Sequence, residues 1–93
     1  MGPWNVPVTV SSSAYKHGIT RDEIFYAIRN AQHVERNYGR PQLPDGARAT
    51  LFIGPSRFGT LEVLATITPP DGVHVFHAMQ LREVTRAAIG YQQ

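Results

Sequence analysis

Three short apolar stretches, separated by two turn sequences, restrict the fold of this chain more than any other feature. Apolar side chains alternate with other residues over residues 48–53, 60–68 and 73–79, which is typical of strands that bury one face. The linking sequences GPSRFG and PPDG are rich in residues that favour tight turns. Consecutive strands joined by short turns pair antiparallel. The sequence therefore predicts a three-stranded antiparallel meander.

The N-terminal part of the chain predicts one more strand. Valines alternate with other residues over residues 6–10, and Pro7 favours a sheet edge because proline cannot donate a hydrogen bond to a neighbouring strand. For residues 1–5 the sequence predicts a lead-in segment with little regular secondary structure. Serines at positions 11–13 can cap a short helical turn that Gly18 would end. We therefore expect an edge strand followed by one helical turn.

A strongly signalled helix comes next. Thr20 and Glu23 have the spacing of a capping box, in which two side chains satisfy the free amides at a helix start. The apolar stripe behind them predicts a helix over residues 21–33. The sequence NYGRPQLPDG, residues 37–46, contains glycines, prolines, Asn and Asp, and it predicts a loop.

These elements together predict one α+β domain spanning residues 1–93. A closing helix is expected because Leu81, Val84 and Ala88 recur at helical spacing. The length of 93 residues suits a single modest core. We therefore expect a small antiparallel sheet, made of the meander and the N-terminal strand, with helices packed on one of its faces.

Composition and spacing remove several classes of function. The chain has no cysteine, and it contains no Walker loop, nucleophile elbow or dinucleotide fingerprint. A regular strand would place His77 with Val73 and Val75, and His74 on the opposite face, which is poor geometry for a shared metal ion. We therefore expect no metal and no cofactor. The sequence also shows no membrane-length apolar run and no signal peptide, which favours a cytoplasmic location.

The remaining polar residues suit the handling of phosphate, although each one alone is also compatible with an ordinary protein surface. Imidazole can exchange a proton near neutral pH, which makes His17 and His77 candidate acid and base. Eight of the nine basic residues are Arg, whose guanidinium grips phosphate oxygens. Cleavage of RNA through its own 2′-hydroxyl needs a base, an acid and fixed cations, and it needs no metal. The candidate cations are Lys16, Arg48, Arg57, Arg82 and Arg86.

Three segments of the chain also share their motifs and spacing with a known protein family. They are KHGIT at residues 16–20 with Glu23 and Ala27 behind it, RATLFIGPSRFGTLEVL at residues 48–64, and VHVFHAMQLREVTR at residues 73–86. Together they resemble the BrnT toxins. The resemblance implies a RelE-like fold and a cytoplasmic ribonuclease toxin that cuts mRNA. It also implies a DNA-binding antitoxin that neutralises the toxin in a hetero-oligomer.

The resemblance also points to individual residues. His17, Arg48 and either Arg82 or Arg86 match positions of the family motif, and Lys16 matches as well. Two positions depart from it, because Ala47 stands where the family has an acidic residue and HAM at residues 77–79 stands where it commonly has Ser-Ala-Arg. Either His77 supplies proton transfer in place of the missing arginine, or the catalytic set is incomplete.

The sequence leaves three functions open. The first is a metal-independent endoribonuclease in which His17, Arg48 and His77 share one cleft and form the catalytic set. The second is a non-catalytic module that keeps the toxin fold and binds RNA or protein. The third is a structural module that dimerises through its sheet edge. For the toxin, we expect the closing helix and the sheet edge to bind the antitoxin, because a basic cleft attracts an acidic partner.

Overall fold

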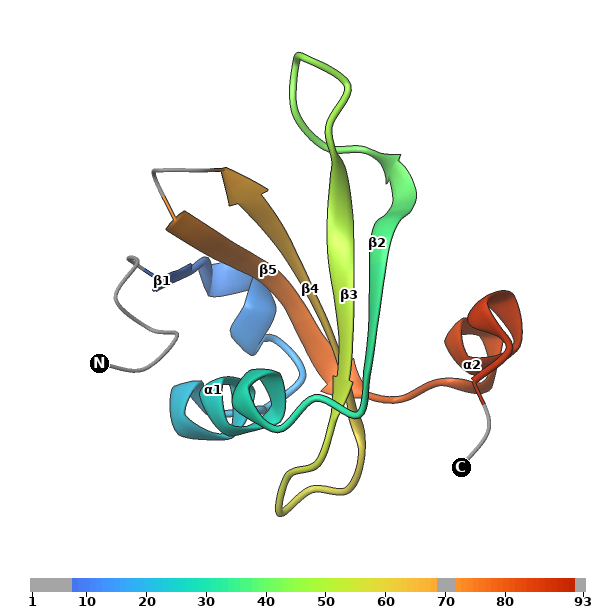
Figure 1. Cartoon of the computed structure of the whole chain (residues 1–93). Coiled ribbons are helices and arrows are strands. Elements are labelled where there is room, and N and C mark those ends of the chain that lie inside the picture. The colour runs from blue at the N-terminus through green and yellow to red at the C-terminus, as the bar shows by residue number, and fades with distance from the viewer. Residues whose placement is uncertain (1–7, 69–71, 92–93) are drawn as a thin grey trace.

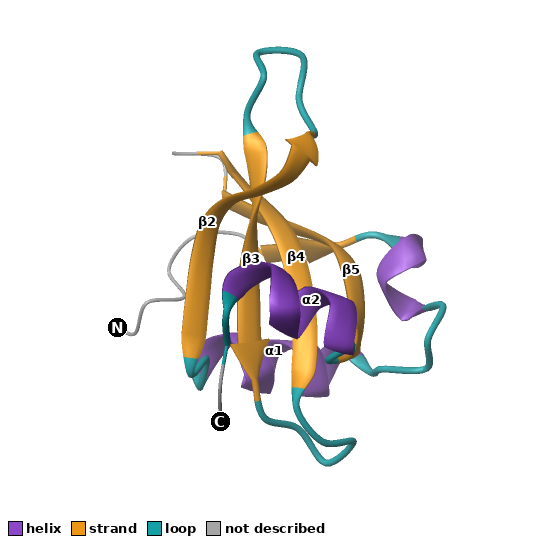
Figure 2. Ribbon diagram, turned by 90° about the vertical axis from the view of Figure 1, so that its right-hand side faces the viewer, coloured by secondary structure: helices purple, strands orange, loops and turns teal. Residues whose placement is uncertain are grey.

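The computed structural model describes residues 8–68 and 72–91, which form one sheet with helices on both of its sides. Figures 1 and 2 show α1 and α2 on opposite sides of this sheet, so the expectation that the helices pack on one face is wrong. Along the chain the elements are β1 (Val8–Val10), the 3-10 helix η1 (Ser12–Tyr15), α1 (Arg21–Arg29), β2 (His33–Pro41), β3 (Arg48–Gly54), β4 (Leu61–Thr68), β5 (Gly72–Gln80) and α2 (Glu83–Ile89). No helix among the described residues is long and apolar enough to cross a membrane.

The five-stranded sheet has the order β1-β5-β4-β3-β2. The strands from β2 to β5 pair antiparallel, whereas β1 pairs parallel with β5 at the opposite edge. The predicted α+β class, the meander and the edge position of the N-terminal strand are confirmed. The expectation of an antiparallel sheet is wrong for that strand, because β1 pairs parallel with β5. The described residues do not include the lead-in, residues 6 and 7 of that strand, or most of the PPDG turn.

The strand β2 is the main correction to the predicted fold. It occupies the end of the predicted helix and much of the predicted loop, because α1 already ends at Arg29. Both faces of β2 are mostly polar, so its sequence carries little of the alternation that indicates a strand. Asn37 and Gly39 have positive φ values of 57° and 78°, and they lie where the pairing of β2 with β3 shifts register. These turn-favouring residues therefore form irregularities inside a strand.

The core lies between α1 and one face of the sheet. We call this the α1 face, and Phe52, Val63 and Ala78 belong to it. One half of the predicted capping box forms, since Thr20 Oγ1 accepts a hydrogen bond from the Glu23 amide at 3.4 Å. The Glu23 carboxylate instead accepts hydrogen bonds from Arg57. The apolar stripe of α1 is buried against the sheet through Ile24, Ala27 and Ile28.

A β-bulge at Phe76 changes which face the end of β5 presents. Ala65 pairs with Val75 while Leu64 pairs with His77, so Phe76 is the extra residue. His77 therefore lies on the face opposite Val75, and not with the valines as regular alternation predicted. This second face also carries Leu51 and Glu62, and we call it the α2 face.

Candidate functional site

The two candidate proton-transfer residues meet at the open end of β5. The strand β1 pairs with β5 only as far as Val75. Beyond that point η1 docks on the same edge, because Ser13 Oγ donates to the Phe76 carbonyl at 2.8 Å. The loop after η1 then carries His17 to His77, and their ring centroids lie 5.9 Å apart at an interplanar angle of 74°. Segments far apart in the sequence thus bring two imidazoles into contact.

A buried carboxylate holds this arrangement on the α2 face. Glu62 is 1% exposed, and its Oε2 lies 2.9 Å from His77 Nε2. The same carboxylate accepts from the backbone amide of Arg82 at 3.0 Å and from its Nε and Nη2 at 3.0 and 2.7 Å. Burial raises the pKa of Glu62, but the hydrogen bonds from His77, Arg82 and Thr85 outweigh it and lower the pKa from 4.5 to about 2.

This carboxylate determines the tautomer of His77. An ionised carboxylate can only accept hydrogen bonds, so Nε2 of His77 carries the proton that it shares with Glu62. Nδ1 is therefore the ring nitrogen left for proton exchange with another molecule. A carboxylate that orients an imidazole in this way is a common device of acid–base catalysis. The side chain of His77 is 18% exposed, so the ring remains within reach of solvent.

Arg82 supplies a cation beside the Glu62 and His77 pair. It is the N-cap residue of α2, and its bonds to Glu62 raise the pKa of Arg82. Its side chain is 49% exposed, and Nε and Nη2 carry the hydrogen bonds to Glu62. The remaining guanidinium hydrogens are free to point outward to an anion. Arg82, rather than Arg86, is thus the arginine of α2 that lies at the site.

A cavity opens beside His17. It encloses about 350 Å³ and is lined by His17, Gly18, Ile19, Phe58, Met79 and Gln80. Met79 supplies an apolar part of the cavity wall. A cavity of this size lies within the usual range for small-ligand sites.

Arg48 is the clearest error in the predicted catalytic set. Alternation along β3 puts it with Thr50 and Phe52 on the α1 face, whereas His77 lies on the α2 face. Arg48 instead lines a separate cavity of about 310 Å³ that includes Thr50 and Ile67. The predicted cleft shared by His17, Arg48 and His77 therefore does not form.

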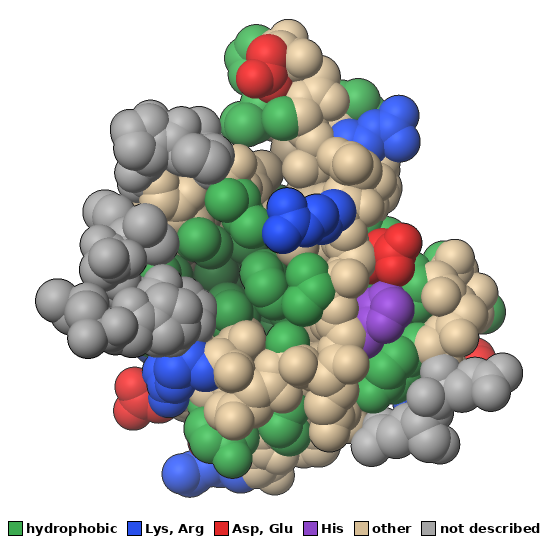
Figure 3. All heavy atoms as spheres, in the orientation of Figure 1, with side chains coloured by type: hydrophobic (Ala, Val, Ile, Leu, Met, Phe, Trp, Pro, Cys, Tyr) green, Lys and Arg blue, Asp and Glu red, His purple; other side chains and the backbone are tan. Residues whose placement is uncertain are grey.

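The other predicted cations are dispersed. Arg57 pairs with Glu23, whose Oε2 accepts from its Nε at 2.8 Å. Arg86 lies 3.6 Å from Glu83 and covers the ring of a C-terminal tyrosine. Lys16 is exposed next to His17 in the sequence. In the view of Figure 3, Lys and Arg side chains lie at separate points around a hydrophobic patch rather than in one cluster.

Sequence analysis missed Glu62, although it organises the site. In the sequence TLEVL it alternates with apolar neighbours, a pattern that indicates a solvated face. Only the bulge at Phe76, which turns His77 toward Glu62, reveals a different role. No signal in the sequence marks that bulge.

Within residues 8–68 and 72–91, no group of three or more His, Cys, Asp or Glu side chains is placed to hold a metal ion. No protein-family model, curated protein or solved structure matches this chain. The chemistry of the site therefore carries the functional inference.

Proposed function

We propose that this protein is a metal-independent endoribonuclease, the toxin of a type II toxin–antitoxin pair related to the BrnT toxins, with a RelE-like fold. The contact between His17 and His77, with Glu62 holding the inner ring, is the observation that supports it most. Two imidazoles beside a fixed cation are the groups that cleavage through the 2′-hydroxyl requires. The setting proposed for this activity is the cytoplasm, where mRNA and a DNA-binding antitoxin are both present.

The reaction follows from the roles of these groups. One imidazole takes the proton of the 2′-hydroxyl, and the 2′-oxygen forms a bond to phosphorus. The bond from phosphorus to the 5′-oxygen breaks, and the other imidazole gives that oxygen its proton. The products are a 2′,3′-cyclic phosphate and a 5′-hydroxyl. Arg82 stabilises the negative charge that collects on the phosphate oxygens, while Glu62 orients the ring of His77 through the hydrogen bond to Nε2.

A second function is favoured by the position of Arg48. With Arg48 on the opposite face and Met79 in place of an arginine, Arg82 is the one site cation among the described residues that directly contacts the Glu62 and His77 pair. This pattern suits a module that keeps the toxin fold and binds RNA or protein without cutting. The two functions differ in one result, which is whether RNA is cleaved.

The test is an RNA cleavage assay in the presence of a chelator. The parent protein should cut RNA and leave 2′,3′-cyclic phosphate ends. His77→Ala should lower the rate by about 10²-fold to 10⁴-fold, the usual worth of a positioned acid–base group. The matched control is His74→Ala, because His74 lies on the same strand and bonds Thr9 at 2.7 Å. A His77→Ala protein that cuts as fast as the parent contradicts the proposed catalytic role.

A further inference from the structure

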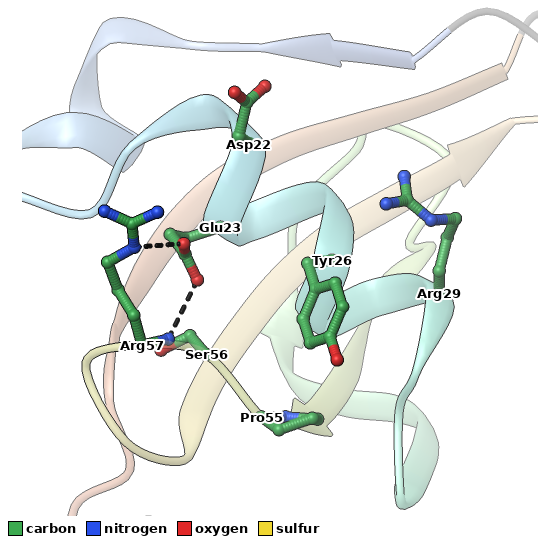
Figure 4. Close-up of a pocket in the computed structure, with 7 residues that line it drawn as sticks. All are labelled: Asp22, Glu23, Tyr26, Arg29, Pro55, Ser56 and Arg57. Atoms are coloured by element: carbon green, nitrogen blue, oxygen red, sulfur yellow. Dashed lines mark hydrogen bonds and ion pairs between the residues drawn. The ribbon is translucent and has the colours of Figure 1, made fainter.

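A third cavity, which we call the hollow, lies at the turn between β3 and β4, and Phe58 of the same turn lines the cavity beside His17. The hollow encloses about 540 Å³ between the outer side of α1 and residues 55–57. Figure 4 shows the ring of Tyr26 above Pro55, with Glu23 and Arg57 on one side and Arg29 on the other. An aromatic ring that is 47% exposed thus forms one wall of a hollow edged by two guanidinium groups.

The turn that forms the other wall is held in one conformation. Glu23 accepts from the Arg57 amide through Oε1 at 2.9 Å and from Arg57 Nε through Oε2 at 2.8 Å. Within the turn, Ser56 Oγ donates to the Gly59 carbonyl at 2.7 Å and accepts from the Phe58 amide at 2.9 Å. Arg57 and Phe58 are therefore presented in fixed positions, and both carboxylate oxygens of Glu23 already have donors.

This turn connects the hollow to the proposed reaction centre. Phe58 lines the cavity that contains His17, and the preceding residue, Arg57, lines the hollow that contains Tyr26. Both aromatic rings are partly exposed, at 37% for Phe58 and 47% for Tyr26. Exposed aromatic rings interleaved with arginines are how proteins hold unpaired bases of single-stranded nucleic acid.

The charges of the hollow show which kind of contact dominates there. Asp22 and Glu23 oppose Arg29 and Arg57, so the formal charges cancel. A hollow without excess positive charge gains little from phosphate attraction and depends on stacking of a flat ring on Tyr26. Base stacking is only weakly sensitive to salt, in contrast to phosphate contacts.

We propose that the hollow binds an unpaired nucleobase of the same RNA, flanking the scissile phosphate, with the base stacked on Tyr26. This inference rests on the proposed ribonuclease function, and it names the substrate as single-stranded RNA that extends beyond the cleaved dinucleotide. A duplex is excluded as substrate because its bases are already stacked on each other.

The test compares a dinucleotide with a longer single-stranded RNA. Tyr26→Ala should raise KM for the longer RNA about 5-fold to 150-fold, the range that corresponds to one stacked base, and should leave dinucleotide cleavage unchanged. Tyr26→Phe retains the ring and should behave as the parent. Tyr91→Ala is the matched control, because it removes another tyrosine ring at the C-terminal end of the described chain. The increase in KM should persist when the salt concentration is raised.

A binding measurement separates this inference from the cleavage reaction. The probe is the same RNA with 2′-O-methyl groups, which cannot cyclise, and fluorescence anisotropy gives its Kd. A parent that binds the probe through Tyr26 without cutting RNA would overturn the ribonuclease proposal and support the base hollow. A parent that cuts RNA while Tyr26→Ala changes neither KM nor Kd would overturn the base hollow alone. Loss of antitoxin binding in Tyr26→Ala, with RNA binding intact, would instead identify a protein surface and would also overturn it.

Discussion

Glu62 is the residue on which the geometry of the site depends. Its buried carboxylate receives hydrogen bonds from His77 on β5, from Arg82 at the start of α2, and from Thr85 within α2. A buried charge with several donors is stabilised, but replacing it by a neutral amide leaves some of those donors without an acceptor. One carboxylate thus fixes a strand, a helix and a candidate catalytic ring.

Replacing Glu62 by glutamine should therefore destabilise the protein. A pKa lowered from 4.5 to about 2 corresponds to about 3 kcal/mol of folding free energy at neutral pH. We expect Glu62→Gln to lower the free energy of unfolding at pH 7, measured with urea, by about this amount. Glu35→Gln is the matched control, since Glu35 pairs with His33 while its side chain is 42% exposed, and it should cost little.

The same comparison has a defined pH dependence. The pKa of Glu62 is lower in the folded state, so its contribution is fully present above pH 4.5 and is lost as the pH falls toward 2. The difference in unfolding free energy between the parent and Glu62→Gln should therefore narrow below pH 4.5. A difference that stays constant from pH 7 down to 2 would contradict the charged, hydrogen-bonded state of Glu62.

The candidate proton-transfer residues were easier to predict than their spatial grouping. His17 and His77 were both predicted from side-chain chemistry, and His17 also from the resemblance to the BrnT motif. The structure brings their rings together. The predicted sheet face of His77 was wrong, because the extra residue Phe76 moves the side chains that follow it in β5 to the opposite face. The position of Arg48 was wrong because a shared motif does not state which face of the sheet a residue occupies.

At the scale of elements, α1 and β3 approach each other closely at Gly54. A Cβ placed on Gly54 would collide with the backbone carbonyl of Ala27 in α1. Backbone atoms cannot move aside as the tip of a side chain can. This contact sets how near the helix lies to the sheet, and it therefore helps to place the β3–β4 turn against Glu23.

Gly54→Ala should consequently lower the free energy of unfolding by about 3 kcal/mol, the upper part of the usual range for overpacking. Gly90→Ala is the comparison, because Gly90 has a φ of 67° but open space around it. That change strains only the backbone and should lower the free energy of unfolding by about 1 kcal/mol. Urea unfolding of both variants measures the difference. A Gly54→Ala protein that is more stable than Gly90→Ala would show that the helix and strand are not in close contact.

The elements themselves were predicted unevenly, and for physical reasons. The strands β3, β4 and β5 were predicted because each buries one apolar face, which leaves alternation in the sequence. The strand β2 was missed because its stability comes from pairing with β3 and not from apolar alternation of its own. The start of α1 was predicted from the spacing of Thr20 and Glu23. Its end was predicted too late, at residue 33, because α1 ends at Arg29 and His33 begins β2.

At the scale of the whole molecule, the site and the surface proposed for the antitoxin are separable. Glu62 contacts the buried side of α2 through Thr85, whereas the side chain of Val84 on the same helix is 66% exposed. Val84 therefore lies on the outer face of α2, which is the face that a partner bound to this helix would contact. If α2 binds the antitoxin, the partner would sit directly over the elements that hold Arg82 and Glu62.

Val84→Glu should then weaken the complex without affecting RNA cleavage. Burying an unpaired carboxylate in an interface is costly, and we expect the Kd to rise about 10-fold or more. Co-expression with the product of the adjacent reading frame and copurification measure the complex, and the cleavage assay supplies the control. Unchanged copurification of Val84→Glu would place the antitoxin elsewhere on the molecule.

The dependence of the RNA cleavage rate on pH tests the central claim most directly, because His17 and His77 must be in opposite protonation states for the reaction. The parent rate should pass through a maximum, since one ring acts as base and the other as acid. His17→Ala and His77→Ala should each lose one limb of that profile, and His74→Ala should keep both. A profile in His77→Ala with the same two limbs and the same maximum rate as the parent would contradict catalysis by the paired imidazoles.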